Sequence, residues 1–264
     1  MDHLFTFPLD AWMLVLIASG FSLLAGCVDA IVGGGGLILV PALLSLYPGA
    51  PPATLFGSNK GAAVWGTAWA TWQYARRVEL AWRALLPAAG AAALGSFAGA
   101  WTVTQVNPQG LRQLLPVILV AVLAYTLVKK DFGQHHAPRA AGRAQIALAC
   151  AIGAGVGFYD GFFGPGTGSF LVFFFVRLLG YDFLHASASA KLVNMATNLA
   201  ALSLFAATGH VWWHLAAAMA VANVAGSLLG TRIALRGGTV LIRRVFIGVV
   251  SALILKTSWD AWLS

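Results

Sequence analysis

The chain has 264 residues, of which 59% are hydrophobic and only 9% are charged, and its mean hydropathy is +0.82. A soluble domain carries roughly a quarter charged residues, so a chain this apolar cannot cover a water-facing surface, and a soluble enzyme is excluded. A membrane span needs about 20 apolar residues, which leaves room for about eight to ten spans. The composition predicts an all-α polytopic membrane protein.

Ten apolar segments follow one another along the chain. They run roughly over 11–31, 36–47, 54–74, 80–103 and 110–128, and then over 144–162, 168–180, 184–207, 211–235 and 240–258. The first ten residues contain no Lys or Arg, so the first segment is expected to be a retained span and not a cleaved signal. The polar stretch 129–143 separates a first predicted membrane repeat, 1–128, from a second, 144–264.

An offset of 131 residues relates the two halves of the sequence. It aligns Asp29 with Asp160, Lys60 with Lys191, and six glycines of the first half with glycines of the second. Internal repeats of this kind are typical of secondary transporters. The sequence therefore predicts a duplicated unit of about five segments.

The distribution of Lys and Arg predicts how the two units are oriented. If the segments alternate in direction, nearly all cations fall on one side, which the positive-inside rule assigns to the cytoplasm. The linker 129–143 is then cytoplasmic and the N-terminus lies outside. An odd number of segments per unit turns the second unit upside down, which is the inverted-repeat plan.

The second segment of each half is too short to cross a bilayer, since about twelve residues rise only about 18 Å. Each one follows a glycine cluster, Gly33 to Gly36 or Gly164 to Gly168. We expect broken hairpins that turn near the bilayer midplane, where free N–H groups and the positive end of a helix dipole would attract anions. The alternative is close helix packing through small residues.

Lys60 and Lys191 each lie several residues inside an apolar segment. A cation in hydrocarbon costs at least about 2.5–3.5 kcal/mol, so it normally faces a cavity or a partner. One interpretation is a shared central site. The other is snorkelling or a structural ion pair with Asp29 or Asp160, and these carboxylates are also candidate proton carriers.

The predicted substrate-binding set combines the two lysines, the glycine breaks and the polar residues beside them. Its members are Lys60, Lys191, Gly33, Gly34, Gly35, Gly36, Gly164, Gly166, Thr167, Gly168, Ser169, Asn59, Asn194 and Asn198. Interhelical hydrogen bonding is the alternative role for the asparagines.

No pattern of catalytic residues emerges from the sequence. His210 and His214 share a helix face, but no third metal ligand lies nearby, and the two cysteines are isolated within apolar stretches. We expect no enzyme activity, no metal, no cofactor and no nucleic-acid partner.

Four stretches carry a family resemblance: GFYDGFFGPGTGSF (157–170), ASAKLVNMATNLAALSLF (188–205), DAIVGGGGLILVPAL (29–43) and GSNKGA (57–62). They resemble the TauE/SafE family of sulfite-exporter-like membrane proteins. The resemblance implies a multi-pass protein of the bacterial inner membrane that exports sulfite or organosulfonates. The alternatives are a passive anion channel and a structural membrane protein without transport activity.

Overall fold

The computed structural model describes residues 9–105 and 133–262, and the regular structure in these ranges is helical. The predicted segment 110–128 lies outside the described residues. The helices are α1 (Leu9–Val32), α2 (Gly36–Leu46), α3 (Pro52–Ala75), α4 (Trp82–Val103), α6 (Gly142–Phe162), α7 (Thr167–Phe174), the π-helical turn η1 (Phe175–Leu179), α8 (Phe183–Ala207) and α9 (Trp213–Trp262).

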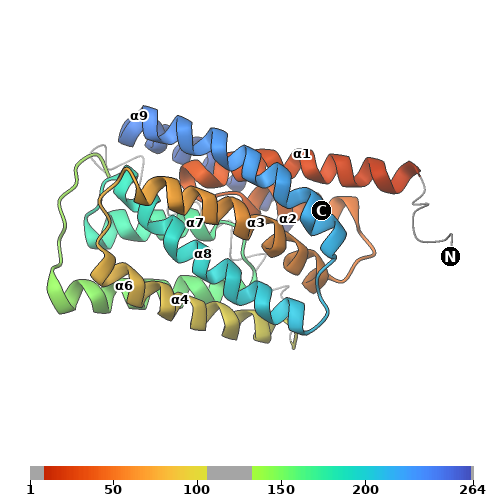
Figure 1. Ribbon diagram of the computed structural model, residues 1–264, viewed down its shortest axis with the longest axis horizontal. Coiled ribbons are helices and arrows are strands. Elements are labelled where there is room, and N and C mark those ends of the chain that lie inside the picture. The colour runs from red at the N-terminus through yellow and green to blue at the C-terminus, as the bar shows by residue number, and fades with distance from the viewer. Residues whose placement is uncertain (1–8, 106–132, 263–264) are drawn as a thin grey trace.

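The long helices lie roughly side by side along the long axis of the molecule (Figure 1). α1 packs along α9 on one side, and α4 packs along α6 on the other. Between these two pairs, α3 and α8 contact each other and the outer helices. The two central helices carry Lys60 and Lys191, so the predicted site residues lie inside the bundle.

Five of the described helices are long and apolar enough to cross a membrane: α1, α4, α6, α8 and the first part of α9. This confirms the all-helical, multi-spanning class. α3 has 24 residues, about 36 Å of helix at 1.5 Å per residue, but it carries Ser58, Asn59 and Lys60 and is less apolar. α2 and α7 have 11 and 8 residues, so they are short, as predicted.

The helix boundaries recur along the chain at the predicted offset. α2, α3 and α4 begin at Gly36, Pro52 and Trp82, and α7, α8 and α9 begin 131 residues later, at Thr167, Phe183 and Trp213. In Figure 1, α3 is directed to the left of the view and α8 to the right, and α4 and the first part of α9 also run in opposite directions. The last two predicted segments, 211–235 and 240–258, correspond to two helices that meet at a kink at Gly238 and share the label α9.

Close helix contacts recur at the same offset. A Cβ atom on Gly99 of α4 would lie 2.0 Å from the carbonyl oxygen of Phe158 in α6, and one on Gly230 of α9 would lie 2.2 Å from that of Cys27 in α1. Such separations are sterically impossible for a side chain, so these backbones touch as small-residue interfaces do in membrane bundles. The α1–α9 and α4–α6 pairs are thus packed in the same way.

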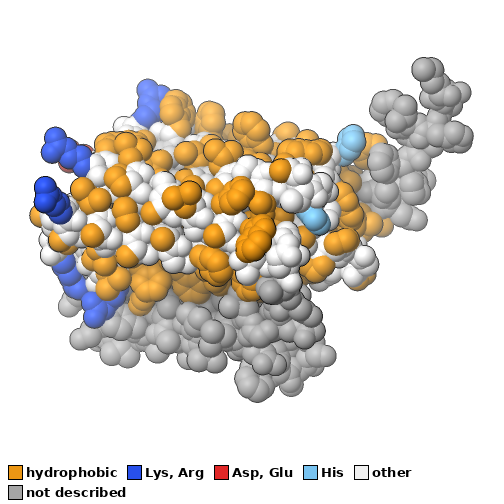
Figure 2. Space-filling view, turned by 90° about the horizontal axis from the view of Figure 1, so that it is seen from below, with side chains coloured by type: hydrophobic (Ala, Val, Ile, Leu, Met, Phe, Trp, Pro, Cys, Tyr) orange, Lys and Arg blue, Asp and Glu red, His pale blue; other side chains and the backbone are white. Residues whose placement is uncertain are grey.

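The cations of the described loops gather at one end of the bundle. Figure 2 shows Lys and Arg side chains at the left of the view and histidines toward the right, with hydrophobic side chains between them. Arg76 and Arg77 follow α3, and Arg139 precedes α6. The loops 47–51 and 208–212, toward the other end, contain no Lys or Arg. This charge distribution is the one that the positive-inside rule requires of a single cytoplasmic end.

The sidedness is testable by cysteine labelling. In a background with Cys27 and Cys150 replaced by serine, His135→Cys at the cationic end and Gly49→Cys at the opposite end each introduce one exposed thiol. A membrane-impermeant maleimide added to intact spheroplasts is expected to label Gly49→Cys and to reach His135→Cys only after permeabilisation. Labelling of both from outside would contradict the cytoplasmic assignment of the linker.

Candidate functional site

The two glycine breaks meet inside the bundle. Between α1 and α2 the chain turns at Gly33, with φ +79°, and between α6 and α7 it turns at Gly164 and Gly166, with φ +90° and +87°. The N–H of Ser169 donates to the carbonyl oxygen of Gly33 at 3.1 Å, and the Ser169 hydroxyl donates to that of Val32 at 3.2 Å. The loops from the two halves therefore form one centre.

A buried ion pair joins α3 to the end of α6. Lys60 Nζ lies 2.6 Å from Asp160 Oδ1, and the two side chains are 5% and 2% exposed. The hydroxyl of Thr167, at the start of α7, donates to the same carboxylate oxygen at 2.7 Å. Since breaking a buried pair leaves an uncompensated charge at a cost of about 3–5 kcal/mol, Lys60 and Asp160 depend on each other.

A second ion pair joins α8 to the end of α1. Lys191 Nζ lies 3.1 Å from Asp29 Oδ2 and also donates to the backbone carbonyl of Asp29. Lys191 is fully buried, whereas the Asp29 side chain is 14% exposed. Each lysine is thus paired with the aspartate of the other half of the sequence. These contacts are the ion pairs of the structural interpretation, and a shared substrate site at the lysines stays a prediction.

One atom of this centre has no protein partner among the described residues. Asp160 Oδ2 is buried and makes no hydrogen bond there, although Oδ1 of the same carboxylate receives both Lys60 and Thr167. A buried carboxylate oxygen without a donor carries a desolvation cost of about 1–3 kcal/mol or more. It is therefore a position where a proton, or a donor on a bound molecule, would be stabilising.

The residues of the centre surround a small cavity of about 20 Å³. Its volume corresponds to about one water molecule, so the centre has little free space in this arrangement. The predicted site residues that line it are Asp29, Gly33, Gly36, Asn59, Lys60, Asp160, Gly164, Gly166, Thr167, Gly168, Asn194 and Asn198.

Four predicted residues are placed outside the cavity lining. A side chain at Gly34 would meet Val249, and one at Gly35 would meet the backbone of Ala25. The Ser169 hydroxyl donates to the carbonyl oxygen of Val32, next to Gly33. Lys191 donates to the Asp29 carboxylate, and Asp29 itself lines the cavity. Some of the backbone N–H groups that were expected to be free for an anion already donate hydrogen bonds within the protein. The N–H of Thr167 donates to the carbonyl oxygen of Gly164 at 3.3 Å, and that of Ser169 donates to the carbonyl oxygen of Gly33.

Sequence reasoning missed two residues of the centre, Ala63 and Thr67. Ala63 lines the cavity, and the Thr67 hydroxyl lies 3.5 Å from Asp29 Oδ2 and 3.4 Å from Asn198 Nδ2. The repeat offset contained the signal, since Ala63 corresponds to Asn194 and Thr67 to Asn198. Thr67 was overlooked because threonine is common in helix packing and carries no charge.

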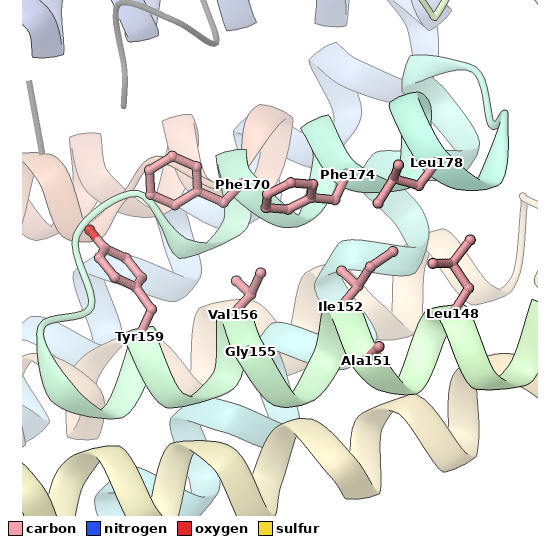
Figure 3. Close-up of a pocket in the computed structure, with 9 residues that line it drawn as sticks. All are labelled: Leu148, Ala151, Ile152, Gly155, Val156, Tyr159, Phe170, Phe174 and Leu178. Atoms are coloured by element: carbon pink, nitrogen blue, oxygen red, sulfur yellow. The ribbon is translucent and has the colours of Figure 1, made fainter. Parts of the chain in front are cut away.

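A larger cavity lies elsewhere and has a different character. It measures about 450 Å³ between α6 and the α7–η1 segment, and aliphatic and aromatic side chains line it. Figure 3 shows Leu148, Ile152 and Val156 of α6 facing Phe170, Phe174 and Leu178 across it. The described residues of its lining include no charged side chain, so this space suits apolar groups, and the polar centre remains the candidate site for an anion.

Comparison with known proteins gives consistent matches over nearly the whole chain. A family model described as "Sulfite exporter TauE/SafE" matches residues 18–257. The probable membrane transporter protein ORF9 of Sinorhizobium sp is 35% identical over 240 residues, covering 90% of this chain and 89% of that protein. No solved structure matches significantly.

Two further relatives carry the same kind of name. The probable membrane transporter protein YfcA of Escherichia coli K12 is 35% identical over 240 residues, covering 91% of this chain and 88% of that protein. A probable membrane transporter protein of Haemophilus influenzae is 32% identical over 246 residues, covering 93% and 94%. With five apolar helices and these relatives, this is a multi-pass protein of the bacterial inner membrane. The chain belongs to the TauE/SafE family of membrane transporters.

Proposed function

We propose that this membrane transporter exports small sulfur-containing oxyanions, with sulfite as the first candidate, through the polar centre between α3 and α8. The observation that carries the proposal is the pair of buried lysines at the junction of two broken helices. Lysine ammonium groups bind oxyanions as compact point charges, and bilayer-depth cations are normally functional. The family description, sulfite exporter, supplies the sulfur chemistry.

We further propose that the two halves, 1–128 and 144–264, are inverted repeats joined by the cytoplasmic linker 129–143. Support comes from the helix starts that recur after 131 residues, from the opposite run of corresponding helices (Figure 1), and from the exchanged lysine–aspartate pairs. Transporters with this plan place the substrate at the interface of the repeats and alternate access by moving one repeat against the other. The cavity of about 20 Å³ fits an arrangement in which no substrate is bound between the repeats.

The charges of the centre determine how an anion would bind. Two lysines and two aspartates cancel, so the site offers no net positive charge until a carboxylate is protonated or displaced. A proton on Asp160 Oδ2, the atom without a donor among the described residues, would release Lys60 for the anion. We therefore propose that a sulfite dianion moves together with one proton and carries one net negative charge outward.

Voltage then drives export, because each elementary charge is worth about 2.3 kcal/mol per 100 mV across a membrane that is negative inside. The test uses proteoliposomes with a tenfold higher sulfite concentration inside, equal pH on both sides and a potential set by valinomycin and potassium. Net flux is expected to stop when the interior is positive by about 60 mV, whereas a dianion moving alone would stop at about 30 mV.

The same vesicles separate the competing functions. A transporter shows saturable counterflow, in which unlabelled external sulfite accelerates loss of labelled internal sulfite. Flux that never saturates and shows no counterflow would indicate a passive channel. Flux equal to that of empty liposomes, for sulfite, thiosulfate, sulfoacetate and taurine alike, would contradict the proposed function.

A further inference from the structure

A second polar cluster lies at the cationic end of the molecule, away from the central cavity. It contains His136 from the segment between the two halves, and Asp182 and His185 at the start of α8. Potential metal-ligating atoms of the three residues all lie within 4.8 Å of one another. The chain separates His136 from the other two by more than forty positions, so only the fold brings the three together.

Backbone hydrogen bonds hold the two segments beside each other. The N–H of Phe183 donates to Gly133 at 2.9 Å, that of Ala137 to Gly180 at 2.9 Å, and that of Arg139 to Leu179 at 2.9 Å. These bonds flank His136 on both sides. The position of its imidazole relative to α8 is therefore fixed by the backbone.

The geometry within the cluster resembles a set of adjacent metal ligands. His185 Nδ1 lies 2.9 and 3.0 Å from the two carboxylate oxygens of Asp182, and the imidazole rings of His136 and His185 are 3.9 Å apart between centroids. Ligand atoms bonded at about 2.1 Å to one tetrahedral ion are separated by about 3.4 Å. A potential ligand atom of His136 lies within 4.8 Å of those of Asp182 and His185.

Helix capping explains part of the cluster but not all of it. Asp182 is the N-cap of α8 and accepts the backbone N–H of His185 at 2.7 Å, as an N-cap aspartate should. The cap requires neither imidazole. It also leaves unexplained why His136, from another segment, stacks on His185 and on Tyr181, at 5.2 Å between centroids.

A cavity of about 280 Å³ adjoins the cluster and gives room for further ligands. His136 and His185 line it together with Glu79, Gln145 and Tyr181. Structural and catalytic zinc sites take four ligands, of which water or a carboxylate often supplies the last. The cavity therefore offers both an entry path and space for the remaining coordination positions.

We propose that His136, Asp182 and His185 bind a divalent transition-metal ion of the zinc class. Two imidazole nitrogens and one carboxylate oxygen are the ligands that such ions prefer, whereas Mg²⁺ and Ca²⁺ favour all-oxygen sites. The ion takes the place of the proton on the ring nitrogen that faces Asp182. It links the segment between the two halves to α8, the helix that carries Lys191.

The test measures binding to the purified full chain, produced without a histidine tag and treated with a chelator. Titration with Zn²⁺ by calorimetry, and with Co²⁺ by its visible absorption, is expected to show one ion per chain. His136→Ala and His185→Ala are each expected to weaken Zn²⁺ binding at least about tenfold. His135→Ala changes the exposed neighbouring histidine and is the matched control, expected to bind like the parent.

Asp182→Asn separates metal binding from capping, because asparagine is an equally good N-cap but lacks the charge. It is expected to keep the thermal stability of the metal-free parent and to lose Zn²⁺ affinity at least about tenfold. The proposal is overturned if the parent binds no stoichiometric Zn²⁺. It is equally overturned if His136→Ala and His185→Ala bind as tightly as His135→Ala.

Discussion

Replacing Lys60 with alanine is expected to destabilise the protein by about 3–5 kcal/mol and to abolish sulfite transport. The change leaves Asp160, 2% exposed, without its ion-pair partner in the interior of the bundle. Lys191→Ala has the same expected effect through Asp29, which loses its partner at 3.1 Å. Thermal unfolding in detergent and proteoliposome flux measure the two consequences separately.

The double variant Lys60→Met/Asp160→Asn tests whether Lys60 is needed only for stability or also for substrate transport. It removes both charges while keeping the volume and the acceptor for the Thr167 hydroxyl, so most of the lost stability should return. Neutral replacement of a buried pair is often close to neutral for stability. Transport should remain absent, because the site has lost one cation and its proposed proton-binding carboxylate. A stable double variant that transports at the parental rate would make the Lys60–Asp160 pair purely structural.

Gly168→Ala is expected to cost about 3 kcal/mol and to inactivate the protein. A Cβ atom at this position would lie 2.3 Å from the Cα atom of Gly33, where the two broken hairpins touch. The backbone at Gly168 does not have a positive φ, so the effect is steric and arises from contact between the halves. Thermal stability and sulfite flux are the measurements.

Gly90→Ala is the matched control for this substitution. Gly90 lies within α4, and a Cβ atom there would meet no atom of the described residues within 4 Å. Alanine at this position should change the free energy of unfolding by no more than about 1 kcal/mol. If Gly168→Ala were as harmless as Gly90→Ala, the two glycine breaks would not be in contact as described.

Much of the fold follows from apolar segment lengths and the repeat offset. The bounds predicted for the described helices agree with the structure within a few residues, including the short second segments at α2 and α7. The last two predicted segments, 211–235 and 240–258, also agree, because the non-helical backbone at Gly238 divides α9 at the gap between them.

The members of the central site were largely predictable, but their pairing was not. Buried lysines and glycine breaks stand out because each is costly in a membrane. Which aspartate meets which lysine depends on how the halves dock, so the exchange of partners between them appears only in three dimensions. The same reason hides the cluster of His136 with Asp182 and His185, since His136 alone looks like a solvent-exposed loop residue.

Direct binding of sulfite to the purified protein tests the central claim, that the Lys60–Asp160 pair belongs to the anion site. Radiolabelled sulfite is titrated onto the parent and onto Lys60→Met/Asp160→Asn, with thermal unfolding confirming that both are folded. We predict saturable binding at one sulfite per chain for the parent and none for the double variant. Equal sulfite affinity in the two proteins would contradict the account.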